Sequence, residues 1–391
     1  MGNVPNLRFP EFSGEWSSQP LTDFMNFKNG LNPDAKRFGR GTKFISVMDI
    51  LNNQYICYDN IRASVELQDG DIETYGVDYG DILFQRSSET LEDVGRANVY
   101  LDSKPAIFGG FVIRGKSKGN YNPLFFRYLL ASPTARKRII VKGAGAQHFN
   151  IGQDGLSKVS LDIPRLSEQE KIGKLLQCVD ARIATQNKII EDLKKLKSAI
   201  IHRCYSSQTN MIPLSELLKQ CSDRNRSGSD LQVLSVSNKY GFIAQSNQFE
   251  DREVASDDTS NYKVVKKGMF AYNPARINVG SIALYEMDGN GIVSPMYVCF
   301  TTKSELLPSY LKYYFASQTF KHEMYKRLEG SVRLCLTFEE LCNIEIHLPS
   351  IEQQKNISKY ISKIENNLSL VDSIFSKYQQ QRRYLLSQMF I

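Results

Sequence analysis

The sequence lacks the features of a membrane-spanning or exported protein. Its 391 residues contain no run of about 18 apolar residues, the length that a membrane-spanning helix needs. The first residues, MGNVPNLRFPEF, have no basic start followed by an apolar stretch, and Asn6 stands where a myristoylation signal has Ser or Thr. The chain is 41% apolar and 23% charged, which is typical of globular proteins. We therefore expect a cytoplasmic protein of two or three domains.

Patterns that hold metals or disulfides are also missing. The seven cysteines are odd in number and none stands in a C-x-x-C pair, and the four histidines form no H-x-x-x-H pair. We expect reduced thiols and no metal site.

Several catalytic signatures are absent as well. There is no H-E-x-x-H, no dinucleotide fingerprint, no kinase signature and no amino-methyltransferase motif, since YNPAR (272–276) lacks the second proline and the aromatic. We expect no catalytic residue, no cofactor-binding residue and no metal ligand in this chain.

One string resembles a nucleotide site. Residues 110–117, GFVIRGKS, match G-x-x-x-x-G-K-[ST], the pattern of a phosphate-binding loop. A true loop of this kind is flexible and opens a helix, whereas Phe111, Val112 and Ile113 favour a strand and a turn follows. We expect a core strand that ends in a basic turn, and we reject an NTPase.

The chain repeats itself at a shift of 185 residues. NPLFFRYLLASPTARKRI (122–139) aligns with LPSYLKYYFASQTFKHEM (307–324), and the register then holds without a gap to the C-terminus. Upstream the match persists with small offsets, for example between YGDILF around Gly80 and KKGMFA around Gly268. Such self-similarity indicates a duplication. The predicted parts are a globular domain at 1–164, a helical segment at 165–206, a second domain at 207–348 and a second helical segment at 349–391.

Each helical segment carries an apolar stripe. Apolar residues recur in steps of three and four, the spacing of a coiled-coil seam. The seam residues are Leu176, Val179, Ile183, Ile190, Leu193 and Ile200, and, in the second segment, Ile361, Ile364, Leu368, Val371, Phe375, Tyr378 and Leu385. Both seams contain a basic residue at the same place, Lys197 and Arg382. Two copies in one chain pair most simply about a pseudo-two-fold axis, which makes the helices antiparallel. Two separate amphipathic helices, each packed on its own domain, are the alternative.

The globular copies combine short β-rich runs with helices. Runs such as 43–50, 81–86 and 107–114 alternate with turn residues, and Asn122 with Pro123 predicts a helix start. The expected fold class is α+β: two similar mixed domains joined by two long helices that pair as an antiparallel coiled coil.

Basic and amide side chains concentrate in the connections of both copies. The net charge is +7, and Arg, Lys, Asn and Gln are the side chains that contact base edges and phosphates. In the first copy these candidates are Arg86, Ser87, Arg96, Asn98, Lys116, Lys118, Lys142, Gln147, His148 and Asn150. In the second copy they are Arg224, Arg226, Asn273, Arg276, Asn278, Lys326, Arg327 and Arg333. Ordinary solvated loop residues are the alternative for any single one.

The chain resembles the specificity subunit of type I restriction-modification systems. The similarity lies in the opening VPNLRFPEFSGEW, in P-x-[LI]-x-x-Q-x-x-I at the entry to each helix, and in the domain–helix–domain–helix order. The resemblance implies a non-catalytic subunit whose two target recognition domains each read half of a bipartite double-stranded DNA site, with the helix pair setting the spacer. Its implied partners are two modification subunits, which bind S-adenosylmethionine and methylate adenine, and two restriction subunits, which hydrolyse ATP with magnesium. A coiled-coil adaptor that binds proteins through its end domains is the alternative.

Overall fold

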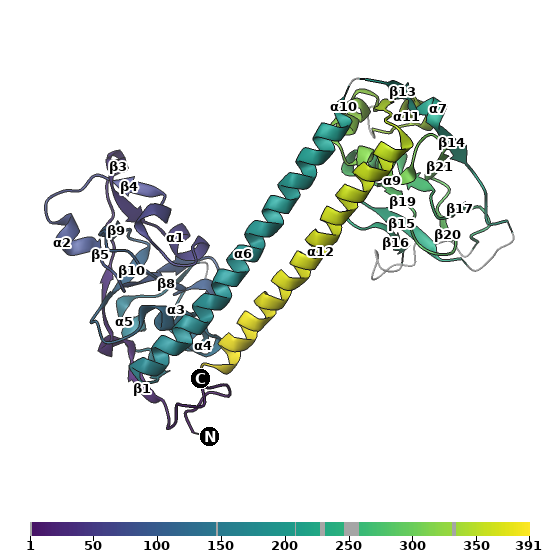
Figure 1. The fold of residues 1–391 in the computed structure, drawn as a ribbon. Helices are drawn as coiled ribbons and strands as arrows, with labels where there is room; N and C mark the ends of the chain where they lie inside the picture. The colour runs from purple at the N-terminus through teal and green to yellow at the C-terminus, as the bar shows by residue number, and fades with distance from the viewer. Residues whose placement is uncertain (1, 146–147, 208, 227–230, 246–257, 331–333) are drawn as a thin grey trace. The chain divides into compact units, whose positions relative to one another are not determined.

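The computed structural model describes residues 2–145, 148–207, 209–226, 231–245, 258–330 and 334–391 (Figure 1). The chain forms two compact units. The first comprises Met1–Asn187 with Ser373–Ile391, and the second comprises Lys188–Asp372.

The first unit contains a domain built on two four-stranded sheets. One sheet has the order β4-β3-β9-β5 and the other the order β2-β10-β6-β8. Two small strand pairs, β1 with β12 and β7 with β11, complete the domain. The strands are β1 (Ser17–Pro20), β2 (Met25–Asn29), β3 (Phe38–Ile45), β4 (Ala63–Val65), β5 (Gly76–Val77), β6 (Ile82–Gln85), β7 (Ser87–Ser88), β8 (Ala97–Val99), β9 (Ala106–Phe108), β10 (Val112–Ser117), β11 (Phe149–Asn150) and β12 (Ser160–Ile163).

Short helices flank these sheets. They are α1 (Val47–Asn52), α2 (Asp71–Tyr75), α3 (Pro123–Ala131), α4 (Pro133–Ile140) and α5 (Gln153–Ser157), with 3-10 turns η1 (Leu21–Asp23), η2 (Ala35–Arg37), η3 (Tyr58–Asn60) and η4 (Leu91–Asp93). The helix start predicted from Asn122 and Pro123 is confirmed, because the Asn122 side chain accepts a hydrogen bond from the Phe125 amide at 2.9 Å. Helix α3 buries Phe125, Phe126 and Leu129 in the core.

The second unit repeats this topology. Its sheets have the orders β16-β15-β20-β17 and β14-β21-β18-β19, and β13 pairs with β22 as β1 pairs with β12. The strands are β13 (Met211–Pro213), β14 (Leu218–Cys221), β15 (Val233–Ser237), β16 (Gly241–Ala244), β17 (Lys263–Val265), β18 (Phe270–Tyr272), β19 (Ile282–Leu284), β20 (Gly291–Val293), β21 (Val298–Thr302) and β22 (Glu345–His347). The helices are α7 (Leu214–Leu217), α9 (Pro308–Phe315), α10 (Gln318–Lys326) and α11 (Phe338–Cys342), with the 3-10 segment η5 (Pro274–Val279).

Pairing details support the duplication where the sequence match is loose. In each domain one strand pair of the first-named sheet is parallel, β3 with β9 and β15 with β20. Gly80 and Gly268 both adopt a left-handed backbone, with φ of 89° and 91°, just before the equivalent strands β6 and β18. An L side chain is disfavoured in that conformation. The internal repeat predicted from the sequence is therefore present in the fold.

Two long helices follow the domains: α6 (Leu166–Tyr205) and α12 (Ile351–Gln388). They pair antiparallel, because Asp180 of α6 contacts Arg382 of α12 while Lys197, further along α6, contacts Glu365, earlier in α12. Every predicted seam residue is buried or half-buried, whereas the residues between them in the helix middles are mostly exposed. The burial pattern agrees with the coiled-coil prediction and excludes two unpaired helices.

The glutamine of the helix-entry motif fixes each long helix to its domain. Gln169 donates to the Pro164 carbonyl and accepts from the Asn122 amide at the start of α3, at 2.9 and 3.0 Å. Gln354 makes the same bridge, from the Pro349 carbonyl to the Leu307 amide at the start of α9. Both glutamines are buried. The motif therefore joins two helix starts through one amide side chain.

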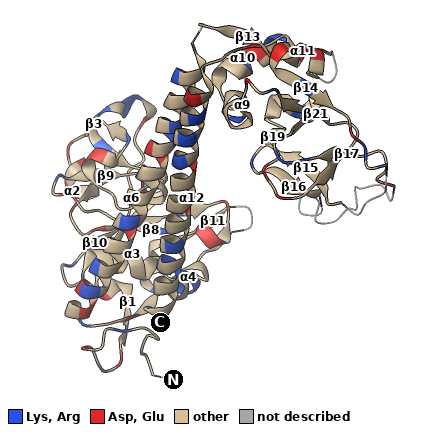
Figure 2. Cartoon of the chain, turned by 45° about the vertical axis from the view of Figure 1, so that its right-hand side comes forward, with Lys and Arg blue, Asp and Glu red and all other residues tan. Residues whose placement is uncertain are grey.

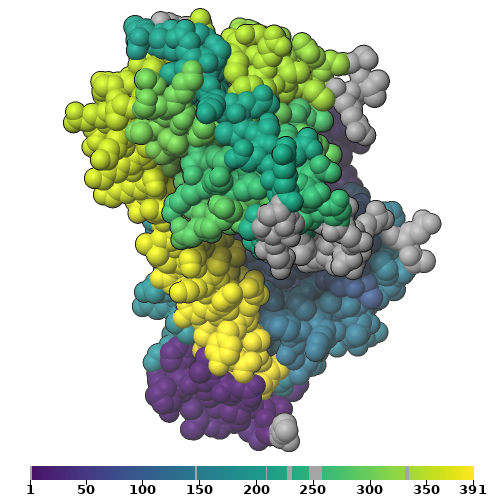
Figure 3. All heavy atoms as spheres, turned by 90° about the vertical axis from the view of Figure 1, so that its right-hand side faces the viewer, coloured from purple at the N-terminus to yellow at the C-terminus, as the bar shows by residue number. Residues whose placement is uncertain are grey.

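The N-terminal segment closes the first unit against both long helices. Arg8 forms two hydrogen bonds of 2.8 Å with Glu168, near the start of α6, and the Trp16 indole donates to the same carboxylate. The Leu7 amide donates to the Gln388 carbonyl at the end of α12 at 2.9 Å. Figure 3 shows the N-terminal residues packed against the C-terminal part of α12.

Candidate nucleic-acid interface

The strand pair β7–β11 gathers several predicted DNA-contacting residues of the first domain. Ser87 lies opposite Asn150, and its hydroxyl donates to the Asn150 side-chain oxygen. The Arg86 carbonyl accepts from the Ile151 amide, and His148 stands exposed two residues before Asn150. Residues from positions 86–88 and 148–150 are thus brought together by one short antiparallel pair.

Arg96 and Lys142 extend this surface. The Arg96 carbonyl accepts from the Gln85 amide at 2.7 Å, which places Arg96 beside the strand that leads to Arg86. Its side chain is 54% exposed, and its guanidinium pairs with Asp93 at 2.6 Å. Lys142 follows α4 and is exposed. Figure 2 shows other Lys and Arg residues on α4 and along the long helices.

Asn98 has a structural position. It is 3% exposed, and its amide donates to the carbonyls of Ile50 and Asn53 at 3.1 and 2.8 Å. Both donor hydrogens are used to hold the end of α1. The amide therefore has no hydrogen left to donate to a base edge, and we exclude Asn98 from the predicted base contacts.

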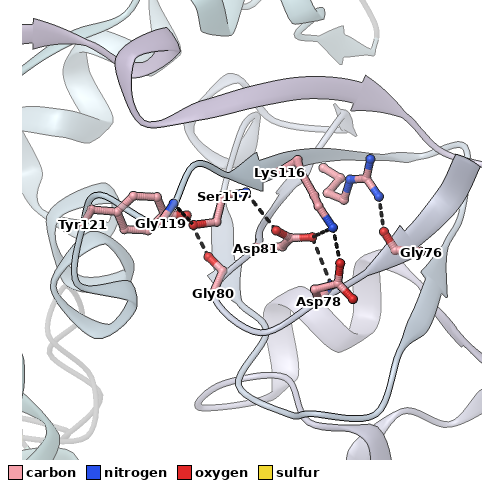
Figure 4. Close-up of polar contacts among 9 residues, drawn as sticks. Gly76, Asp78, Gly80, Asp81, Lys116, Ser117, Gly119 and Tyr121 are labelled. Carbon is pink, nitrogen blue, oxygen red and sulfur yellow. Dashed lines mark hydrogen bonds and ion pairs between the residues drawn. The ribbon is translucent and has the colours of Figure 1, made fainter. Parts of the chain in front are cut away.

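Lys116 and Lys118 lie at the C-terminal end of β10, whereas the Arg86 amide bonds to Phe111 just before β10 begins, and both lysines bind the protein itself. Lys116 pairs with Asp78 and lies 3.9 Å from Asp81 (Figure 4). Lys118 donates to the Thr22 carbonyl at 2.6 Å. These lysines tie the end of β10 to neighbouring segments, which reduces the charge that they offer to a phosphate.

The phosphate-loop match is wrong in structure as well as in context. Its last six residues form β10, and the Ser117 amide donates to the Asp81 carboxylate at 2.8 Å (Figure 4). Burial raises the pKa of Asp81 above its ordinary value. A phosphate-binding loop needs backbone amides that are free to donate to the phosphate, whereas here the Ser117 amide already donates to the Asp81 carboxylate.

The same stretch, Gly115-Lys-Ser-Lys-Gly, has the G-x-S-x-G spacing of a hydrolase nucleophile elbow. That motif requires a sharp turn from strand to helix, and Ser117 is instead the last residue of β10, followed by a turn. Its hydroxyl accepts from the Gly119 amide, and no described histidine hydrogen-bonds to it. The spacing therefore does not produce a catalytic serine.

In the second domain, three of the predicted DNA-contacting residues lie together on η5 and its cap. Asn273 caps this segment by accepting from the Ala275 amide at 3.1 Å, and Arg276 is exposed. Asn278 is half-buried, and its carbonyl accepts from the Tyr325 hydroxyl at 3.5 Å. The segment presents one guanidinium between two amides.

The remaining candidates of this domain are dispersed. Arg224 donates to Asn261 at 2.8 Å, and Arg226 follows it in a turn. Lys326 and Arg327 both pair with Glu323, at 2.8 and 2.6 Å, and lower the pKa of that carboxyl. Gln147 and Arg333 lie outside the described residues.

The predicted DNA contacts leave out four basic residues of the short helices. Arg127 and Arg136 of the first domain align with Lys312 and Lys321 of the second at the 185-residue shift. That recurrence of positive charge was a signal available in the sequence.

A polar cluster involving Arg127 lies where α3 meets the long helices. Asp180 is 7% exposed and accepts from Arg127 at 3.2 Å, Tyr128 at 2.9 Å and Arg382 at 2.6 Å. Burial lowers the pKa of Arg127. In the second unit Glu365 accepts from Tyr313 at 2.8 Å and Lys197 at 2.6 Å. The tyrosine, acid and base of one cluster match those of the other at the 185-residue shift, so the two clusters are equivalent.

Among the described residues, no group of three or more His, Cys, Asp and Glu is arranged to hold a metal ion. None of the helices in that part of the chain is long and apolar enough to cross a bilayer. The seven cysteines are free thiols.

Comparison with known proteins decides between the DNA reader and the adaptor. A model of the type I restriction modification DNA specificity domain matches residues 13–195 and 227–374, one match on each copy. The chain belongs to this family. It is a specificity subunit with two recognition domains, and as such a non-catalytic component of a type I system.

Relatives match this specificity subunit over nearly its full length. The putative type I restriction enzyme MjaX specificity subunit of Methanocaldococcus jannaschii is 22% identical and aligns with 94% of this chain and 91% of its own. The MjaVIII specificity subunit of the same organism is 24% identical, with 93% and 88% covered. The crystal structure of the S subunit from M. genitalium has a TM-score of 0.62 at 15% identity and covers 99% of both chains, which shows a shared fold.

Proposed function

We propose that the two recognition domains read the two halves of one asymmetric, bipartite DNA site. The observation that carries this proposal is the contrast between a repeated frame and different contact groups. Both domains have the same sheet orders, but the first presents Ser87 with Asn150 on a strand pair and the second presents Asn273 with Arg276 on a 3-10 segment. Different side chains on one frame suit different base sequences.

The helix pair supplies the spacer in this proposal. A continuous α6 of 40 residues spans about 60 Å at ~1.5 Å per residue. Two recognition domains joined by such an element read two base groups separated by unread base pairs.

In this proposal, partner subunits carry out the methylation and cleavage reactions. Two modification subunits dock on the specificity subunit, bind S-adenosylmethionine and methylate adenine, and two restriction subunits that use ATP and magnesium join them for cleavage. This chain then selects the DNA and positions those subunits.

The test is a genome-wide map of methylated adenine in cells with and without this chain. We expect one bipartite sequence, methylated in both halves, to lose its methylation when the gene is deleted and to regain it on complementation. An unchanged methylation map in cells whose modification subunits are expressed would contradict the proposal.

A further inference from the structure

An equivalent hollow lies in each recognition domain, beside its two consecutive short helices. In the first domain a cavity of about 410 Å³ is bordered by the end of α1, η4, β8, α3 and α4, with Arg382 at its edge. In the second, a cavity of about 440 Å³ is bordered by the turn after β15, η5, β19, α9 and α10.

These two cavities are related by the internal repeat. Lining residues of the first match lining residues of the second at the shift of 185, as follows: Ala97 and Ile282, Arg127 and Lys312, Leu130 and Phe315, Ala131 and Ala316, Arg136 and Lys321. The hollow is therefore a feature of the duplicated frame and not of the divergent loops.

Positive charge is the chemical property that the two hollows share. Each is lined by a cation from its first helix, Arg127 or Lys312, and a cation from its second helix, Arg136 or Lys321. Glu92 is the single acidic side chain among the described lining residues of the first cavity, and the described lining of the second has none. Such a lining favours an anion.

The second-helix cations have unused hydrogen-bonding capacity. Arg136 donates through Nη2 to the carbonyls of Glu92 and Val94, whereas its buried Nη1 has no partner among the described residues. Lys321 is exposed and forms no side-chain bond with a described residue. By contrast, Arg127 is bound to Asp180 and Lys312 to Glu286.

Both hollows adjoin the predicted base-contacting groups. Arg96, which lies beside the strand leading to Arg86, lines the first cavity, and Asn278 of η5 lines the second. If the two domains read different sequences, the anionic component common to both half-sites is the sugar-phosphate backbone.

We infer that each hollow binds a backbone phosphate next to the bases that its domain reads, held by Arg136 in the first domain and by Lys321 in the second. This inference rests on the proposed function. The contacts set the register of each domain on the duplex without contributing to base choice.

The salt dependence of DNA binding tests the inference. The full chain, assembled with its modification subunits, is titrated with its bipartite duplex and with an unrelated duplex over a range of salt concentrations. Arg136→Gln and Lys321→Gln should each reduce the slope of log affinity against log salt by about 0.9 and weaken both duplexes equally. The loss should be roughly tenfold at fixed salt.

Lys137→Gln is the matched control, because Lys137 is exposed on α4 next to Arg136 but does not line the cavity. It should keep the wild-type slope. Arg136 also holds η4 through the Glu92 carbonyl, so Arg136→Gln could disturb the fold. Circular dichroism of the variant detects such a defect. If one is found, the result for Lys321→Gln decides the test, because Lys321 is exposed.

Neutral methylphosphonate groups, placed one at a time in each half-site, locate the phosphate. Wild type should lose affinity at one position per half-site, and Lys321→Gln should become insensitive to the position in its own half only.

Unchanged slopes for both variants would overturn the inference. So would weaker co-purification of modification subunits at an unchanged slope, which would assign the hollow to acidic protein side chains. Loss of bipartite preference in wild type would instead contradict the proposed function.

Discussion

Asp180 links the recognition domain of the first unit to both long helices. Its buried carboxylate is surrounded by Tyr128, Arg127 and Arg382, and so joins α3, α6 and α12. Removing one partner from a buried ion pair leaves uncompensated charge and costs about 3–5 kcal/mol. The ion pair of Glu365 with Lys197 should contribute less to stability, because these side chains are 32% and 27% exposed and water screens their charges.

We predict that Asp180→Asn lowers the free energy of unfolding by about 3 kcal/mol, because two guanidinium groups lose their counter-charge. Glu365→Gln should cost only about 1 kcal/mol, since its ion pair is partly hydrated. Urea unfolding of the full chain measures both, since fluorescence of the single tryptophan, Trp16, reports the first unit and circular dichroism reports both units.

Asp192→Asn provides the control, because Asp192 lies exposed on α6 away from the seam. It should leave the unfolding midpoint unchanged. Equal losses for Asp180→Asn and Asp192→Asn would show that the buried cluster contributes nothing beyond surface charge.

The side chains that individual residues contact were the least predictable part of the molecule. The sequence placed Lys197 and Arg382 on the seam from their spacing alone, but their acids and tyrosines are distant in the chain. Asn98 shows the reverse problem. Its residue type suits a base edge, yet burial under α1 determines its role, and no local pattern reports burial of a single amide.

At the scale of elements, the long helices were predictable and the sheets were not. Seven seam positions recur in both helices at the 185-residue shift, with a period that only a helix supports, and α6 begins and ends within a residue of the predicted segment. The strands are mostly short and pair across long sequence separations, as β3 does with β9. Short apolar runs indicate strands but contain no information about the order in which they pair.

A matched heptad insertion, after Asn187 in α6 and after Asp372 in α12, should lengthen the DNA spacer. Seven residues add about 10.5 Å at ~1.5 Å each, which corresponds to about three base pairs at ~3.4 Å per base pair. The seam face is retained because seven residues make nearly two turns. Mapping the methylated sequence measures the spacer.

The insertion in α6 alone is the comparison. It displaces the seam residues after Asn187 by two turns relative to α12, so Lys197 and Glu365 no longer face each other. We expect that variant to lose assembly and methylation. A matched insertion that methylates the original sequence with unchanged spacing would show that the helices do not set the spacer.

At the scale of the whole molecule, the duplication predicts separable specificities. Each recognition domain has its own sheets and core, and each long helix begins at its own glutamine bridge. Replacing residues 1–164 with those of a relative should therefore change one half of the methylated sequence and leave the other half and the spacer intact. Mapping of methylated adenine reports the sequence of each half and the length of the spacer. A changed sequence in both halves would show that the two domains do not read DNA independently.

The two tyrosine–acid–base clusters also bear on how such a chain evolves. Each cluster takes its tyrosine from a recognition domain and its acid and base from different long helices. A domain exchanged between relatives therefore keeps this hydrogen bond to the resident helices only if it carries a hydroxyl at the position of Tyr128 or Tyr313. The loops that carry the predicted base contacts can differ in sequence without disturbing this link, because both clusters are formed by residues of α3, α9 and the two long helices.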